Sequence, residues 1–284
     1  MKITNKLGLP ESFVMYASKS DYGYKENRYS VTELLLPTRE IILNRKYADE
    51  IETDVADSIP ALFGTAVHNV LEANTPLLKG LLTEQSIECQ FGEDTVSGRI
   101  DLLDMNNLEI TDYKTSSVSK VMREDFNDFK LQGLAYAYMV YQRLGIIIKR
   151  LKFPCLLKDW SKIKSASSSN YPSSAIYIWK YEVQESDLDF IEGYIKDKLK
   201  SIHDAETELP ECTDEERWYT GTKYAVFRNA GDKRAAIVCD SEEEAHGYIT
   251  NKYDGAGEIE VRKGEYLKCK YYCNCCKFCK EGGE

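Results

Sequence analysis

The sequence lacks any apolar run that approaches the length of a membrane-spanning helix, and residues 1–5 lack the apolar core of a signal peptide. We therefore expect a cytoplasmic protein that has no membrane partner. An excess of positive charge is also missing, because the formal net charge is −10. This balance argues against a protein that coats nucleic acid without regard to its sequence. The 284 residues, of which 43% are hydrophobic, suffice for one large domain or for a domain with an insertion.

Cysteine is missing from the first part of the chain, before Cys89, although the whole sequence contains nine. In a reducing compartment so many thiols indicate metal binding rather than disulfides. Five of them lie within eleven residues near the end of the sequence, in the pattern Cys269-x-x-x-Cys273-x-Cys275-Cys276-x-x-Cys279. Thiolates accept zinc or an iron–sulfur cluster, so the residues alone leave both the metal and the choice of four ligands open.

Two short strands joined by a polar turn form the most informative stretch of the sequence. Residues 95–103 and 108–115 have the composition of strands, and residues 104–107 have the composition of a tight turn. Side chains alternate between the two faces of a strand, so Asp112 and Lys114 are expected on one face.

The register of this hairpin decides whether a second acidic residue joins them. A turn that pairs Leu103 with Leu108 puts Asp101 opposite Ile110. Residues directly opposite one another share a face, so Asp101 is then diagonal to Asp112. A slip of one residue would move Asp101 to the other face.

Two carboxylates and a lysine at one point suit metal-assisted hydrolysis. Hard divalent cations such as Mg²⁺ or Mn²⁺ take carboxylate oxygens, and a lysine beside them can orient a nucleophile or balance developing charge. The alternative for Asp101, Asp112 and Lys114 is a hairpin whose charged side chains are merely solvated. Aspartates on the same face as strand leucines are unusual on a solvated face, which favours the functional interpretation.

Two predicted helices flank the hairpin. One opens at Pro60 and carries His68, and the other spans about residues 124–144 and carries Gln132 and Tyr136 on one face. Neutral imidazole is an acceptable metal ligand beside carboxylates. A single histidine on a helix is nevertheless more often structural, and an ordinary amphipathic helix alone explains Gln132 and Tyr136.

Asp101 followed by Asp112-Tyr113-Lys114 resembles the catalytic signature of the PD-(D/E)XK nuclease superfamily. The order of the neighbouring motifs narrows the resemblance. The sequence GTAVH ends at His68, and the sequence QGLAY begins at Gln132. This order is similar to that of RecB-type exonucleases, including phage-type members and CRISPR-associated RecB-like nucleases.

The resemblance implies a fold and a role for each site residue. The fold class is α/β, with a restriction-endonuclease-like core in which helices flank a central mixed sheet. The implied metal ligands are His68, Asp101 and Asp112. Lys114 is implied to position or activate the attacking water, and Gln132 and Tyr136 are implied to help place the nucleic-acid strand.

Three regions are expected. They are a nuclease core over residues 1–212, a small inserted β-β-α-β module over 213–265 and a cysteine-rich tail over 266–284. By resemblance, the ligands of an iron–sulfur cluster are Cys212, Cys269, Cys273 and Cys279. In the family the first cluster cysteine lies upstream of the histidine motif. This chain has no cysteine there, so zinc remains the alternative.

The resemblance implies a metal-dependent deoxyribonuclease that processes DNA ends or single strands in recombination, repair or phage replication. Residues 113–164 carry eleven Lys or Arg against four Asp or Glu, a balance that fits contact with phosphates. The alternative is a non-catalytic DNA-binding or assembly subunit of a helicase or recombinase complex. The acidic net charge favours this alternative, whereas an intact set of Asp101, Asp112 and Lys114 counts against it.

Overall fold

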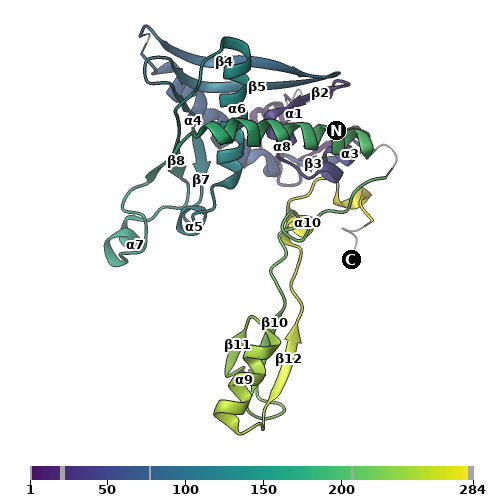
Figure 1. The fold of residues 1–284 in the computed structure, drawn as a ribbon. Coiled ribbons are helices and arrows are strands. Elements are labelled where there is room, and N and C mark those ends of the chain that lie inside the picture. The colour runs from purple at the N-terminus through teal and green to yellow at the C-terminus, as the bar shows by residue number, and fades with distance from the viewer. Residues whose placement is uncertain (1, 20–22, 77, 206–207, 281–284) are drawn as a thin grey trace. The chain divides into compact units, whose positions relative to one another are not determined.

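The computed structural model describes residues 2–19, 23–76, 78–205 and 208–280. The chain divides into two compact units, Met1–Leu209 and Pro210–Glu284 (Figure 1). In the part of the chain that the structure describes, no helix combines the length and the apolar character that crossing a membrane requires.

The first unit is built on a mixed sheet in which seven strands are described. The path is β2-β5-β6-β8-β7, while β4 pairs with β5 and β9 pairs with β8. Pairing is antiparallel between β4 and β5, β5 and β6, and β8 and β9, and parallel elsewhere in this sheet. The strands are β2 (Arg28–Ser30), β4 (Leu81–Phe91), β5 (Asp94–Asp104), β6 (Glu109–Thr111), β7 (Lys114–Ser116), β8 (Arg150–Leu157) and β9 (Ile176–Glu182).

Helices flank this sheet, which confirms the predicted α/β class with a central mixed sheet (Figure 1). The longer ones are α3 (Thr38–Lys46), α4 (Ile59–Ala73), α6 (Asn127–Leu144) and α8 (Glu185–Asp204). The shorter ones are α1 (Glu11–Ser18), α2 (Val31–Leu34), α5 (Val118–Met122) and α7 (Lys162–Ser167), with a 3-10 turn at Val55–Ser58. Two further strands, β1 (Lys2–Thr4) and β3 (Glu52–Asp54), pair in parallel and form a separate two-stranded sheet.

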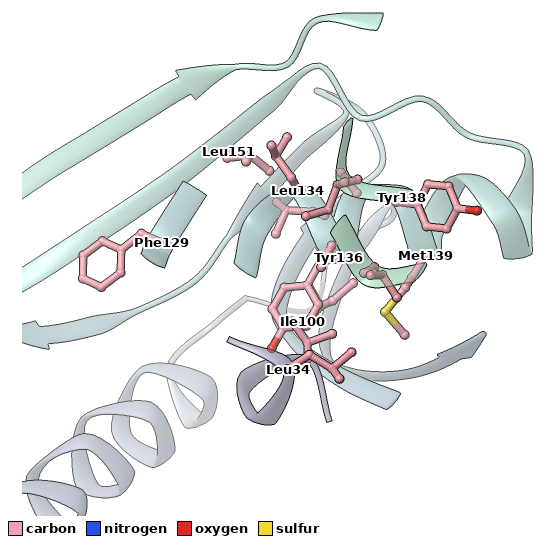
Figure 2. Packing of buried hydrophobic residues seen from close by; sticks show 14 of the residues in the cluster. Leu34, Ile100, Phe129, Leu134, Tyr136, Tyr138, Met139 and Leu151 are labelled. Carbon is pink, nitrogen blue, oxygen red and sulfur yellow. The ribbon is translucent and has the colours of Figure 1, made fainter. Parts of the chain in front are cut away.

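Helix α6 lies at the centre of the hydrophobic core. Residues 132–140 are all buried, so the helix is enclosed on every side rather than along one stripe. Figure 2 shows Leu134, Tyr136 and Met139 of this helix among core residues of the neighbouring elements. The helix ends at Gly145, whose φ of 67° closes it in the left-handed conformation that glycine adopts without strain.

The close approach of α6 to β8 depends on Gly133. A Cβ atom at this position would lie 2.7 Å from a methyl carbon of Leu151 and 2.9 Å from the ring of Phe153. Only a residue without a side chain therefore allows the helix to sit at this distance from the sheet. This contact fixes the distance between the sheet and the face of α6 that carries Gln132 and Tyr136.

The predicted register of the central hairpin is wrong by two residues. Leu103 pairs with Ile110 rather than with Leu108. Asp104 accepts hydrogen bonds from the backbone amides of Asn106 and Asn107. It pairs with Glu109, so the four-residue turn lies one residue later than composition indicated, at residues 105–108. Leu108 follows with a φ of 51° and so leaves the strand conformation. A shift of two residues preserves the face of every side chain, so the predicted grouping of carboxylates is unaffected.

The second predicted hairpin strand is interrupted. Strands β6 and β7 both pair in parallel with β8 and keep the same offset along it, but Asp112 and Tyr113 lie between them outside the ladder. The Asp112 amide still donates to the Lys152 carbonyl at 3.0 Å. The break leaves the Tyr113 amide and carbonyl available to side chains. The predicted helix over 124–144 begins later, at Asn127.

The second unit contains a three-stranded antiparallel sheet, in the order β11-β10-β12, and one helix packed on it. Its elements are β10 (Lys223–Phe227), β11 (Ile237–Cys239), α9 (Glu242–Tyr253) and β12 (Glu258–Arg262). A small core of Val226, Cys239, Ala245 and Ile249 joins sheet and helix. Helix α10 (Leu267–Tyr271) and a 3-10 turn at Cys276–Phe278 follow in the cysteine-rich tail.

Candidate metal centre and active site

Asp101 lies at the centre of the site, on the long strand β5, and is only 8% exposed. Its Oδ2 accepts a hydrogen bond from the Tyr113 amide at 2.7 Å. Its Oδ1 lies 3.1 Å from Nδ1 of His68. The interruption between β6 and β7 thus supplies a backbone donor that fixes one oxygen of the carboxylate. The other oxygen, Oδ1, faces His68 of α4.

His68 reaches the sheet from α4 and is held at both ring nitrogens. Its Nε2 lies 2.8 Å from the Tyr113 carbonyl, which can only accept, so Nε2 carries a proton. The hydrogen bond to Asp101 raises the pKa of His68, against the opposing effect of partial burial. In the neutral ring this arrangement leaves the Nδ1 lone pair for a cation, because metal-binding histidines commonly donate their other N–H to a carbonyl.

Asp112 is the most deeply buried acid of the site, at 2% exposure. Its Oδ1 accepts from the Gln132 amide at 3.3 Å, and its Oδ2 is 2.6 Å from Nζ of Lys114. This close contact is an ion pair, and Oδ2 makes no hydrogen bond of good geometry in the described chain. Burial raises the pKa of Asp112, and the attraction of Lys114 offsets part of that rise.

Lys114 is held in place by neighbours on α6. Its Nζ donates to Oε1 of Gln132 at 2.6 Å and lies 5.4 Å from the centre of the Phe129 ring. The Gln132 amide in turn donates to the Tyr136 hydroxyl at 3.0 Å. The amide of Gln132 therefore orients both Lys114 and Asp112, because it offers its oxygen to one and its N–H₂ group to the other.

Tyr136 closes this hydrogen-bonded chain against β5. A Cβ atom at Gly98 would lie 2.6 Å from the Tyr136 ring, so the ring packs directly on the strand backbone. Burial raises the pKa of Tyr136, which keeps the hydroxyl protonated. Gln132 and Tyr136 are both buried. Gln132 contacts Lys114 and Asp112 directly, whereas Tyr136 contacts Gln132.

Glu84 is a site residue that the sequence did not reveal. It lies on β4, and one of its carboxylate oxygens, one of Asp101 and a ring nitrogen of His68 all fall within 4.8 Å of one another. Burial raises the pKa of Glu84, with an opposing effect of Arg99 and a further increase from Asp101. The register of β4 and β5 places Glu84 opposite Asp101. The residue pattern alone does not predict this register.

The chemistry of these donors can be tested against a divalent cation. Glu84 on β4, Asp101 on β5 and His68 on α4 offer three ligand atoms within 4.8 Å of one another, and the adjacent Asp112 at the β6–β7 break pairs with Lys114. Oxygen donors with one nitrogen suit Mg²⁺ and Mn²⁺. The residues therefore fit such an ion, and they bring His68, Asp101, Asp112 and Lys114 to one place.

The predicted cysteine ligands all lie in the second unit. Burial raises the pKa of the Cys276 thiol, and the neighbouring thiols of Cys273, Cys269 and Cys279 raise it further. Sγ of Cys273 lies 3.5 Å from Sγ of Cys275. Cys276 therefore lies near three of the four predicted ligands, Cys269, Cys273 and Cys279.

Comparison with known proteins gives distant likenesses only. No protein-family model matches the sequence, and no curated protein matches it. Among solved structures, SSO0001 is 16% identical with a TM-score of 0.46, over 67% of this chain and 82% of that one. The alkaline exonuclease LHK-Exo from Laribacter hongkongensis is 9% identical with a TM-score of 0.39, over 69% and 94%.

A phage-related exonuclease from Haemophilus somnus 129PT is 12% identical with a TM-score of 0.32, over 70% of this chain and 83% of that one. Two of these three similar structures are thus described as exonucleases. Likeness at this level does not transfer an activity, and the RecB-type and CRISPR-associated resemblance stays a prediction from the motifs. The residues of the site, rather than these relatives, bear on what the chain does.

Proposed function

We propose that the protein is a metal-dependent nuclease that hydrolyses DNA phosphodiester bonds, an exonuclease acting on DNA ends or single strands in recombination, repair or phage replication. The observation that carries this proposal is the convergence of His68, Asp101, Asp112 and Lys114 at the broken strand between β6 and β7. A purely structural ion-pair cluster would not require an imidazole whose second nitrogen is fixed by a carbonyl.

Each residue has a role in this proposal. His68, Asp101 and Asp112 would hold Mg²⁺ or Mn²⁺, which supplies an activated water and neutralises phosphate charge when bound. Lys114 positions the attacking water, whose oxygen bonds to phosphorus as the bond to the leaving sugar oxygen breaks. The Lys114 ammonium also balances the charge that develops on the phosphate.

Gln132 and Tyr136 position the reacting groups in this proposal. Gln132 contacts Lys114 and Asp112 at once, so it keeps the ammonium beside the carboxylate. Tyr136 fixes the Gln132 amide from behind. Both side chains are buried, which supports a role in positioning Lys114 rather than broad contact with a nucleic-acid strand.

The decisive experiment measures cleavage of end-labelled DNA with and without added Mg²⁺ or Mn²⁺. We expect cleavage only with the metal, and its loss in Asp112→Asn and in Lys114→Met, by at least about a hundredfold. Lys152→Met is the matched control, because Lys152 also lies on the sheet and pairs with a carboxylate, Glu109, at 3.3 Å.

Full cleavage by both Asp112→Asn and Lys114→Met would refute the proposed site. Metal-dependent binding of DNA without cleavage by the wild-type protein would instead support the non-catalytic alternative, in which the fold serves a helicase or recombinase complex. Unchanged thermal unfolding in the two variants ensures that lost cleavage reflects lost chemistry.

We also propose that the tail cysteines hold an iron–sulfur cluster, with zinc as the alternative. The supporting observation is the cluster of thiols around Cys276, because thiolates are ligands of both. Anaerobically purified protein with a broad visible absorbance and bound iron supports the cluster, whereas colourless protein with bound zinc supports the alternative. Cys212→Ser and Cys276→Ser, compared by metal content, identify the fourth ligand, since only its loss reduces the bound metal.

A further inference from the structure

Glu84 occupies an unusual backbone position directly opposite Asp101. Thr83 pairs with Leu102 and Gln85 with Ile100, so the same register sets Glu84 against Asp101. Glu84 has a φ of 51°, in the left-handed region that residues with a side chain rarely adopt. Such a strained conformation persists where the surrounding structure enforces it, most often at functional sites.

Two carboxylates in opposite positions of a sheet repel one another. The site of Asp101 and Glu84 therefore requires a cation. Arg99, on the same strand as Asp101, supplies one through an ion pair between its Nε and Oε2 of Glu84. The two partners differ in exposure, because the Glu84 side chain is 14% exposed and the Arg99 side chain is 64% exposed. The guanidinium can thus leave for solvent, whereas the carboxylate stays beside His68 and Asp101.

We propose that Glu84 is a ligand of the divalent cation, and that Arg99 competes with the cation for the Glu84 carboxylate. The proposal rests on the proposed metal-dependent function and extends it to how tightly the metal is held. Glu84, His68 and Asp101 place three ligand atoms within 4.8 Å of one another, a spacing that one ion can span. When a cation binds, the Arg99 ion pair opens and the cation replaces the guanidinium as the partner of Glu84.

Arg99 therefore sets the affinity of the site. An intact ion pair must be broken before Glu84 can bind the metal, so the arginine weakens binding. Removal of the Arg99 charge leaves the two facing carboxylates without the guanidinium that pairs with Glu84. The affinity of the site for a metal ion therefore rises. Removal of the Glu84 charge has the opposite effect, because a ligand is lost.

The test is Mn²⁺ binding to the full chain, measured by calorimetry and by the electron paramagnetic resonance signal of free Mn²⁺, without DNA. We expect Glu84→Gln to weaken Mn²⁺ binding about tenfold or more, and Arg99→Met to tighten it severalfold. The matched control is Glu88→Gln, because Glu88 lies on the same strand and also pairs with an arginine, Arg28, outside this site. It should leave Mn²⁺ affinity unchanged.

Equal Mn²⁺ affinity in Glu84→Gln and wild type overturns the proposal, as does unchanged or weaker binding in Arg99→Met. Because the Arg99 side chain is exposed, we expect Arg99→Met to fold as the wild type does, and thermal unfolding without metal checks both variants. If wild type binds no Mn²⁺, the metal-dependent function fails together with this inference. If wild type binds Mn²⁺ and Glu84→Gln binds it equally, only the inference on Glu84 fails.

Discussion

At the scale of single residues, the proposed role of His68 as a metal ligand makes cation binding depend on pH. Asp101 raises its pKa above the ordinary histidine value, and the metal-binding Nδ1 must lose its proton before it can bind. Protonation of the site therefore competes with the cation. Because the shift is upward, this competition begins at a higher pH than for an unperturbed histidine.

We predict that Mn²⁺ affinity falls as pH is lowered from about 8 to about 6, by up to about tenfold for each pH unit below the His68 pKa. Calorimetry in two buffers with different ionisation enthalpies should show proton release on binding. His68→Asn should bind Mn²⁺ more weakly and lose most of this pH dependence. An affinity that is constant or rises on acidification would contradict the role of His68.

At the scale of elements, the distance between α6 and β8 depends on one missing side chain. We predict that Gly133→Ala lowers the free energy of unfolding by about 1–3 kcal/mol, because the new methyl overlaps Leu151 and Phe153. Helix propensity alone predicts the opposite sign, a gain of about 1 kcal/mol. Denaturant unfolding of the purified variant measures the difference.

The control for this prediction lies in α8. A Cβ atom at Gly193 meets no atom within 4 Å, so Gly193→Ala should stabilise the protein by about 0.5–1 kcal/mol through helix propensity alone. If both alanine variants are stabilised, α6 and β8 are not in the close contact described.

At the scale of elements, part of the hairpin could be predicted from the sequence and part could not. Alternation along strands predicts Asp101, Asp112 and Lys114 on one face, and this prediction survives an error of two residues in register because such a shift preserves faces. The turn itself depended on side-chain bonds of Asp104 and on the left-handed Leu108, which composition does not reveal. Glu84 could not be found, because its position depends on pairing between two strands and on an irregular φ.

At the scale of the whole molecule, the two proposed metal sites belong to different compact units. All the side chains of the divalent-cation site lie in Met1–Leu209, and the cysteine ligands lie in Pro210–Glu284. We predict that a chain ending at residue 209 keeps its Mn²⁺ affinity and loses the iron or zinc of the full chain. Calorimetry and elemental analysis of both chains check this, and a folded short chain with no Mn²⁺ binding would contradict it.

The central claim is that one divalent cation binds where α4, β4 and β5 meet the break between β6 and β7. Anomalous diffraction from a crystal of the full chain soaked in Mn²⁺ tests this most directly. We predict a manganese peak in contact with Nδ1 of His68 and with carboxylate oxygens of Asp101, Asp112 and Glu84, beside Lys114. A peak bound elsewhere, or none beside His68 at saturating Mn²⁺, would contradict the claim.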